Sequence, residues 1–200
     1  MYNPALEASY DQLLTTRWNT VSMLLIRLIE QAGPEALEGA GRAEFVTRAM
    51  TVLRPIAQDT LTASRTNANR QLRGMGRKAV EADLAELALT RLDVDSLIRA
   101  AARYYFSAGH KKDFTDPATK AQAFRYAAEL VGRQTITMLS DKRLAATSAT
   151  YSAAGIRLYE RYLGSGDHCD LCKQIAGTRV TRDDIKPVHD KCTCGVRPVR

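Results

Sequence analysis

Hydrophobic positions follow a helical period over most of the chain. In residues 4–32 they recur at three-, four- and seven-residue steps, which predicts one long amphipathic helix that stops at Gly33-Pro34. A second helical pattern spans residues 42–74, with Pro55 as an expected kink. Because the heptads are not sustained, these stripes favour the core of a helical bundle over a coiled-coil face.

The next two stretches have a different composition. Residues 63–78 contain five basic residues, two glycines and no acid, and we interpret them as a solvated turn between helices. A contact point for phosphate or for an acidic protein surface is the alternative. Residues 77–91 are rich in good helix formers, and Asp93 or Asp95 is expected to cap a following helix that extends through Phe106.

Aromatic and loop residues mark the centre of the chain. Residues 104–106 are three aromatics in succession, and consecutive residues cannot share one helical face, so at least one side chain must point away from the local core. Residues 109–120 break the helical pattern, and His110 is interpreted as a surface histidine in that loop. Asp116 and Pro117 form a helix start, with aspartate as the cap and proline at the first position.

The period changes near the C-terminus. A long helix is expected from residue 121 to Gly155, with a break near residues 140–141. After it, alternation in residues 156–163 predicts a strand, and short strands are expected at 178–181 and 195–199. The first strand is expected to have Ile156, Leu158 and Tyr162 on one face.

Composition adds a basic charge balance to this picture. The chain has 200 residues, 45% of them hydrophobic, which supports a substantial core. Its net charge of +7 makes anionic partners plausible, but the basic and acidic residues are interspersed. The longest uncharged apolar run is far too short to span a bilayer, so no membrane role is expected.

All four cysteines lie close to the end of the chain. They form Cys169-x2-Cys172 and Cys192-x-Cys194, and His189 stands three positions before Cys192. Thiolates and imidazoles two to four residues apart can bind one tetrahedral zinc ion. The first pair therefore predicts one half of a zinc site, and the other three residues are candidates for the second half. One of the five is surplus, and the spacing does not select it.

Two disulfides are the alternative state of these cysteines, with three possible pairings. No secretory signal peptide is expected at the start of the chain, and in a reducing cytosol cysteine clusters more often bind metal. Redox catalysis lacks the βαβ context it requires. A catalytic zinc is not favoured either, because the nearest carboxylates, Glu160 and Asp170, stand in no zinc-hydrolase motif. We therefore expect no enzymatic activity.

Together these patterns predict a mainly α protein with an elongated multi-helix body, residues 1–155, and a small β-rich, zinc-knuckle-like unit, residues 156–200. A unit of that size has too little core to hold itself together, and a bound metal commonly makes up the deficit. Structural zinc contributes on the order of 10–16 kcal/mol in small zinc peptides.

The ending of the chain resembles the C-terminal motif of phage head morphogenesis proteins, the minor head family named after the F protein of phage Mu. That motif runs from Gly-Ile through Cys-x2-Cys and a glycine to Pro-x-His-x-x-Cys-x-Cys and a closing apolar-proline segment. Its counterparts in this sequence are Gly155-Ile156, Cys169, Cys172, Gly177, Pro187, His189, Cys192, Cys194 and Arg197-Pro198-Val199. The match covers about the last forty-five residues. The rest of the chain is compatible with the family only in its type of secondary structure, which is helical.

The resemblance implies a structural minor head protein present in several copies per virion. It would be assembled in the host cytoplasm and located in the head interior or at the portal vertex. Its partners would be the portal protein or the major capsid protein, and packaged double-stranded DNA is a further candidate. The alternative is a nucleic-acid-binding zinc protein of a cellular host, for which Arg157, Tyr159 and Arg161 offer a basic and aromatic strand face.

Overall fold

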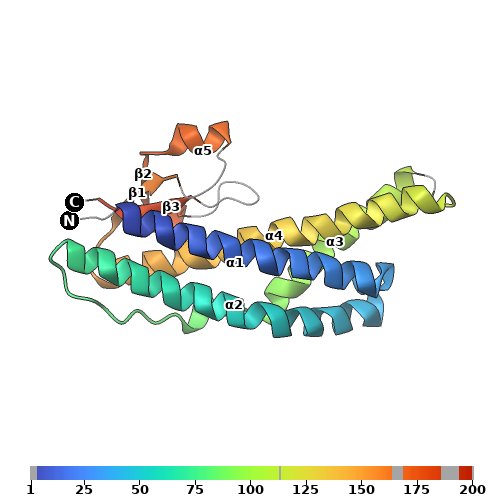
Figure 1. The fold of residues 1–200 in the computed structure, drawn as a ribbon, viewed down its shortest axis with the longest axis horizontal. Helices are drawn as coiled ribbons and strands as arrows, with labels where there is room; N and C mark the ends of the chain where they lie inside the picture. The colour runs from blue at the N-terminus through green and yellow to red at the C-terminus, as the bar shows by residue number, and fades with distance from the viewer. Residues whose placement is uncertain (1–3, 113, 164–168, 186–193, 200) are drawn as a thin grey trace. The chain divides into compact units, whose positions relative to one another are not determined.

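A computed structural model describes residues 4–112, 114–163, 169–185 and 194–199. The protein is mainly helical, as the sequence predicts, and a small antiparallel sheet lies near its C-terminus (Figure 1). Its four long helices are α1 (Pro4–Ala32), α2 (Gly39–Gly74), α3 (Arg91–Lys111) and α4 (Pro117–Ala153). Short 3-10 turns occur at η1 (Pro34–Leu37), η2 (Ala85–Leu87) and η3 (Arg182–Asp184).

The chain divides into two compact units, and the long helices α1, α2 and α4 contribute to both. Unit 1 comprises Met1–Arg17, Ala57–Ala88 and Thr137–Arg200, and unit 2 comprises Trp18–Ile56 and Leu89–Ile136. The C-terminal strands thus share a compact unit with parts of three helices. A separate domain that begins at residue 156 stays a prediction.

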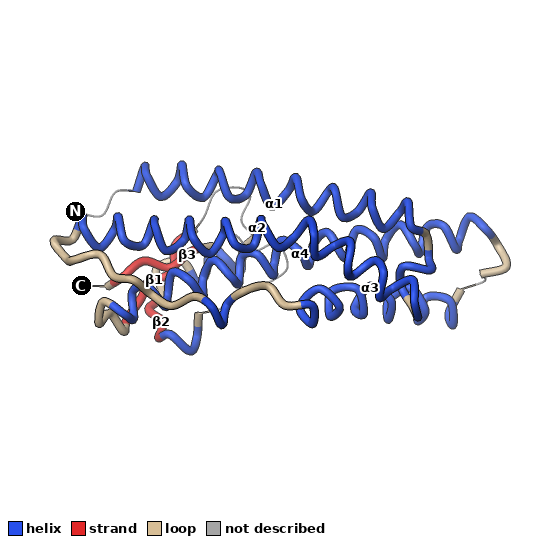
Figure 2. Tube along the Cα trace, turned by 90° about the horizontal axis from the view of Figure 1, so that it is seen from below, coloured by secondary structure: helices blue, strands red, loops and turns tan. Residues whose placement is uncertain are grey.

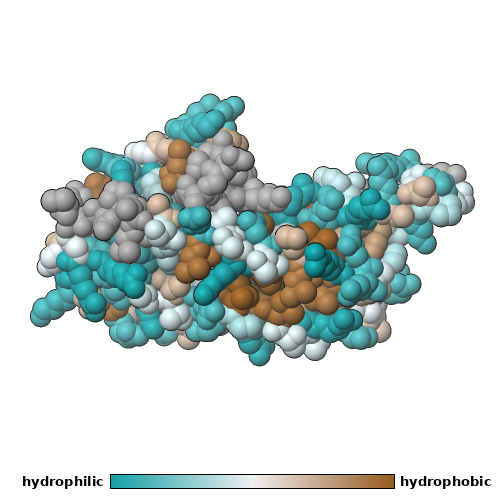
Figure 3. Space-filling view, in the orientation of Figure 1, coloured by the Kyte–Doolittle hydropathy of each residue, from teal (hydrophilic) through white to brown (hydrophobic). Residues whose placement is uncertain are grey.

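The predicted stop of the first helix is confirmed. Gly33 has a φ of 76° and its N–H donates to the Ile29 carbonyl, after which Pro34 opens η1. Apolar surface remains exposed along α1 (Figure 3), where the partly uncovered side chains are those of Leu13, Met23 and Leu24. No helix within the described ranges is both long enough and apolar enough to cross a lipid bilayer.

The basic stretch at residues 63–78 is not the turn that we expected. Helix α2 continues through it to Gly74 and ends in a Schellman motif, in which Gly76 has a φ of 76° and the Arg77 N–H donates to the Leu72 carbonyl. The helix-breaking signal of the glycines therefore acts at the end of the stretch and not at its beginning.

The good helix formers of residues 77–91 do not form a long helix. Apart from η2, this segment is irregular, and it returns along α2 (Figure 1). Asn69 holds it by two hydrogen bonds, because its amide nitrogen donates to the Val80 carbonyl at 2.9 Å and its amide oxygen accepts from the Val80 N–H at 2.8 Å. Arg65 forms an ion pair with Glu81 in the same segment. These side-chain contacts outweigh the local helix propensity.

Helix α3 begins one turn earlier than expected. Its N-cap is Thr90, which forms a capping box with Asp93, so neither Asp93 nor Asp95 is the cap. Asp95 instead pairs with Arg42 at 3.2 Å and with Arg99 at 2.6 Å. The helix extends to Lys111, which places the exposed His110 in its last turn and not in the following loop.

The three successive aromatics behave as predicted, because Tyr105 is buried whereas Tyr104 and Phe106 are more than a third exposed. The start of α4 is also confirmed, since the Asp116 carboxylate accepts hydrogen bonds from the N–H groups of Ala118 and Thr119. The break expected near residues 140–141 is absent, and α4 runs to Ala153 without interruption.

The sheet has the strand order β2-β1-β3, with both pairings antiparallel (Figure 2). Its strands are β1 (Leu158–Tyr162), β2 (Arg179–Thr181) and β3 (Gly195–Pro198), close to the three predicted segments. The alternation of β1 is correct but its phase is opposite to the prediction. Tyr159 and Arg161 are the buried residues, and Leu158 is 39% exposed.

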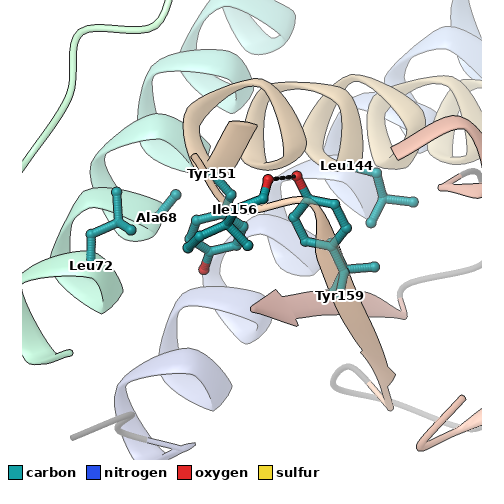
Figure 4. Close-up of a cluster of buried hydrophobic side chains, with 7 residues drawn as sticks. Ala68, Leu72, Leu144, Tyr151, Ile156 and Tyr159 are labelled. Carbon is teal, nitrogen blue, oxygen red and sulfur yellow. Dashed lines mark hydrogen bonds between the residues drawn. The ribbon is translucent and has the colours of Figure 1, made fainter. Parts of the chain in front are cut away.

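A cluster of apolar side chains joins this sheet to the helical part of unit 1 (Figure 4). The Tyr159 ring stacks on the Tyr151 ring of α4 with centroids 6.1 Å apart, and its hydroxyl donates to the Ile156 carbonyl at 2.9 Å. The buried members of the cluster are Ala68, Leu72, Leu144, Tyr151, Ile156, Tyr159 and Val196. Since the sheet's core comes from α2 and α4, the strands depend on the helices for their burial.

Candidate metal centre

The first cysteine pair lies at the start of a short helix, α5 (Asp170–Ile175). Cys169 is the N-cap, and its Sγ accepts a hydrogen bond from the Cys172 N–H at 3.4 Å. The Cys169 carbonyl accepts from the Lys173 N–H at 3.1 Å, which completes the turn. A sulfur atom that receives a backbone N–H in this way is placed as a capping oxygen would be.

Backbone hydrogen bonds attach this turn to the sheet. The Gly177 N–H donates to the Arg161 carbonyl at 2.8 Å, and the Arg161 N–H donates to the Thr178 carbonyl at 3.0 Å. The Arg161 side chain is buried and donates to the Asp184 carbonyl at 2.8 Å. Central strand β1 therefore fixes both the exit from α5 and the segment that follows β2.

The register of β3 brings Cys194 close to Cys172 of the first cysteine pair. Gly195 pairs with Tyr162 at the end of β1, so Cys194 lies just beyond the paired residues. Cys172 is 1% exposed and Cys194 is 3% exposed, and the two pack together in a small buried cluster. The fold thus unites one cysteine of the first pair with one cysteine of the second, as a shared zinc site requires and as two of the three possible disulfide pairings also require.

The complete ligand set stays a prediction. Cys169 is exposed, and within the part of the chain that the structure describes no group of three or more cysteine, histidine or acidic residues is close enough to hold a metal ion. No disulfide joins Cys169, Cys172 and Cys194. The other two candidates, His189 and Cys192, lie outside the described residues.

The donor chemistry of the described residues nevertheless fits zinc. Cys172 and Cys194 supply two sulfur atoms in a water-excluded cluster, and Cys169 Sγ already accepts an N–H from the same turn. Two buried thiols in contact can have one of three roles. They can be apolar packing groups, reduced thiols that form a disulfide when they are oxidised, or metal ligands. Cys169 and Cys172 have the Cys-x2-Cys spacing that is common for paired zinc ligands.

A buried polar network supports this end of the sheet, and sequence reasoning missed it. The Tyr162 ring lies against Gly195 of the neighbouring strand β3, where any Cβ would overlap the ring. The Tyr162 hydroxyl accepts from Arg143 Nη2 at 2.7 Å, and the same nitrogen donates to Asp11 Oδ1 at 2.5 Å. The Arg143 guanidinium also lies over the Tyr10 ring, 5.7 Å from its centroid. The strand that precedes Cys169 is thereby tied to α1 and α4.

Most residues named for nucleic-acid binding or for a catalytic zinc site are buried or ion-paired in the structure. Of the three residues named for nucleic-acid binding, Arg157 is exposed and precedes β1, whereas Tyr159 and Arg161 lie in the strand and are buried. The Tyr159 ring is therefore not available for stacking on bases. Glu160 forms a cross-strand ion pair with Arg197, and the exposed Asp170 pairs with Lys173 at 3.4 Å. Both carboxylates named for a hydrolytic zinc site are therefore engaged in local ion pairs.

No protein-family model matches the sequence, and no curated protein or solved structure matches it either.

Proposed function

We propose that the chain is a structural minor head protein of a bacteriophage, whose C-terminal unit binds one structural zinc ion. The observation that carries this proposal is the burial of Cys172 against Cys194 at the end of the sheet. The segments that connect the strands have the Cys-x2-Cys and His-x-x-Cys-x-Cys spacing of the phage family. No reaction is part of the proposal, and the mechanism is binding.

Zinc would be held by four of five residues, namely Cys169, Cys172, His189, Cys192 and Cys194. Four protein ligands close the coordination sphere and leave no position for substrate, as in structural sites. The ion supplies a crosslink between the segment after β1 and the segment before β3. If the particle is oxidised after assembly, disulfides between the same cysteines are the alternative form of that crosslink.

A crosslinked C-terminal unit is suited to docking on a partner, because a surface that is already ordered loses less conformational entropy when it binds. This unit also exposes apolar side chains, since Leu158, Leu163 and Leu171 are 39%, 37% and 46% exposed. Such residues commonly form the centre of a protein interface. The portal protein and the major capsid protein are the partners that we propose, with the head interior or the portal vertex as the location.

Co-expression with the portal and major capsid proteins of the encoding phage tests this function. The wild-type chain should co-purify with one of them at a salt concentration that removes DNA. Leu171→Asp should reduce recovery at least tenfold, because it puts a charge into the apolar contact. Leu92→Asp is the matched control, since Leu92 is 68% exposed but belongs to α3 in unit 2. Equal recovery of both variants, or no co-purification, would exclude the proposed docking surface.

A further inference from the structure

A hollow of about 310 Å³ lies on unit 2, where the first half of α2 passes the N-terminus of α3. Of the described residues that line it, two are arginines and none is acidic. Met50 is 7% exposed and forms the floor, whereas the other lining residues are exposed and form the rim. This hollow, the Arg91 hollow, is lined by Thr47, Met50, Thr51, Arg54, Pro55 and Arg91.

Arg91 is held in position by uncharged groups. Its Nη1 donates to the Thr47 hydroxyl at 2.9 Å, and its Nη2 donates to the Ala43 carbonyl at 2.9 Å. These bonds occupy two of the five guanidinium N–H groups and leave the others available. Arg91 forms no ion pair with any other residue that the structure describes. Its charge is therefore positioned but not neutralised, which favours an anionic ligand.

Arg54 supplies a second positive charge at the same rim. It is exposed and makes no side-chain hydrogen bond or ion pair within the described ranges. The first two acids of α3 have partners of their own, because Asp93 accepts from the Thr90 N–H at 2.9 Å and Asp95 pairs with two other arginines. The two rim arginines therefore create a local positive potential that attracts an anion.

Pro55 adds a hydrogen-bond acceptor to the hollow. Proline has no N–H, so it cannot donate to the Thr51 carbonyl four residues earlier in α2. A helical carbonyl points along the axis towards the residue four positions later, and both Thr51 and Pro55 line the hollow. The wall therefore presents a carbonyl oxygen without its usual helical donor. The hydroxyls of Thr47 and Thr51 add no donor, because they already donate to the carbonyls of Ala43 and Arg48.

An acidic residue of a polypeptide matches all of these features. Its carboxylate accepts from the guanidinium N–H groups, its backbone N–H donates to the Thr51 carbonyl, and its aliphatic carbons contact Met50 and Pro55. A phosphate diester matches only the first of these features, since it has no N–H donor and no use for an apolar floor. Duplex DNA also binds best to a row of cations along successive phosphates, whereas this hollow has two arginines.

We propose that the Arg91 hollow binds an acidic side chain of a partner protein. The carboxylate pairs with Arg54 and Arg91, and the adjacent backbone N–H donates to the Thr51 carbonyl. All lining residues belong to unit 2 and none is a candidate zinc ligand. The hollow is therefore an interaction site additional to the C-terminal unit, and it does not rest on the zinc proposal.

Titration of the full-length chain with N-acetyl-glutamate N-methylamide tests the hollow. Proton–nitrogen NMR of the arginine Nε–H groups follows Arg54 and Arg91, and each signal is assigned by its loss in Arg54→Gln or Arg91→Lys. We expect saturable shifts of both signals, with a dissociation constant in about the millimolar range for a single residue. The neutral isostere N-acetyl-glutamine N-methylamide should bind about tenfold more weakly, because it cannot form the ion pairs. Equal binding of the two probes, or no saturable shift, overturns the proposal.

Matched variants separate the hollow from the general positive charge of the protein. Arg54→Gln should fold normally, because this exposed side chain has no partner among the described residues, and should weaken the acidic probe about tenfold at the Arg91 signal. Arg125→Gln removes the same charge from an exposed position of α4 in unit 2 that does not line the hollow. It should leave the affinity unchanged, and equal effects of the two variants would overturn the proposal.

Pro55→Ala tests the contact with the Thr51 carbonyl. Alanine supplies the missing N–H, which can then donate to that carbonyl within α2, so the acidic probe should bind the variant several-fold more weakly. Acetate has a carboxylate but no N–H, and it should shift the two arginine signals of the variant as it shifts those of the wild type. An unchanged affinity for the acidic probe would overturn the assigned role of this carbonyl.

Three further outcomes are decisive. If the affinity for a short DNA duplex falls in Arg54→Gln but not in Arg125→Gln, the hollow is a contact for DNA phosphates and the proposal is overturned. If the two arginine signals shift with protein concentration in the absence of probe, the occupant is a second copy of the chain, which overturns the proposal of a different partner protein. Cys169→Ser should bind the acidic probe as the wild type does, so failure of the zinc proposal and failure of the hollow are distinguishable.

Discussion

Arg143 of α4 donates a 2.5 Å hydrogen bond to the carboxylate of Asp11 on α1, and both side chains are at most 3% exposed. The two residues are 132 positions apart in the chain. Because the same guanidinium nitrogen also donates to the Tyr162 hydroxyl, this ion pair links two helices of unit 1 to the strand that leads to the cysteines.

Replacement of Asp11 by alanine should destabilise the protein strongly. It would leave the Arg143 charge buried without its counterion, and breaking a buried pair on one side costs about 3–5 kcal/mol. Urea denaturation followed by circular dichroism measures this loss. The exposed pair Arg17–Asp59 is the matched control, with a separation of 3.7 Å and side chains 46% and 62% exposed. Asp59→Ala should cost below about 1 kcal/mol, and comparable costs for the two variants would contradict a structural role for the buried pair.

The close approach of Tyr162 to Gly195 gives a second prediction. Gly195→Ala should cost about 1–3 kcal/mol, because the new methyl group must displace the tyrosine ring from a packed position. The same substitution in a Tyr162→Leu background should cost much less. A double-mutant cycle from denaturation curves measures the difference, and an unchanged cost in both backgrounds would refute the steric explanation.

The extended segment after α2 should depend on one side chain. Asn69→Ala removes both hydrogen bonds to Val80 and should cost about 1–2 kcal/mol. Asn69→Asp keeps the acceptor and loses the donor, so its effect should be intermediate. Amide hydrogen exchange at Val80 reports the local change, and unaltered protection in Asn69→Ala would show that other contacts hold the segment.

Acid should weaken the N-terminus of α4. Hydrogen bonds from the Thr119 hydroxyl, the Thr119 N–H and the Ala118 N–H lower the pKa of Asp116 below its ordinary value. Because the folded-state pKa is the lower one, the carboxylate's contribution is complete above the unfolded pKa, about 3.9, and is lost as the pH falls through the folded value. Carboxyl NMR of the native chain should show this depressed titration. Asp116→Asn retains a capping side chain but should show no pH dependence at this helix end.

Helix ends were predictable where local chemistry decides them. Gly33-Pro34 stops α1 because glycine accepts a positive φ and proline cannot continue the helix, and Asp116-Pro117 starts α4 for equally local reasons. The segment at residues 77–91 was not predictable in this way. Its helix propensity is good, but Asn69 supplies a hydrogen-bonding partner for its backbone that no local pattern reveals.

The candidate site was predictable only in part. Cysteine spacing identifies the turn at Cys169 and Cys172, and the fold packs Cys172 against Cys194. The phase of β1 escaped prediction because its buried side is held by tyrosine and arginine, while the aliphatic Leu158 faces outward. Asp11 and Arg143 resemble solvated charges when they are read in sequence, and only the tertiary fold makes them partners.

Zinc analysis combined with thiol titration tests the central claim most directly. The full-length chain, purified under reducing conditions without added metal, should contain about one zinc ion per molecule. Its cysteines should react slowly with a thiol reagent until a chelator is added. Cys169→Ser should lose the zinc and the order of the C-terminal strands while the helical circular dichroism signal persists. A metal-free wild-type protein whose four cysteines react as fast in the native as in the denatured state would contradict the account.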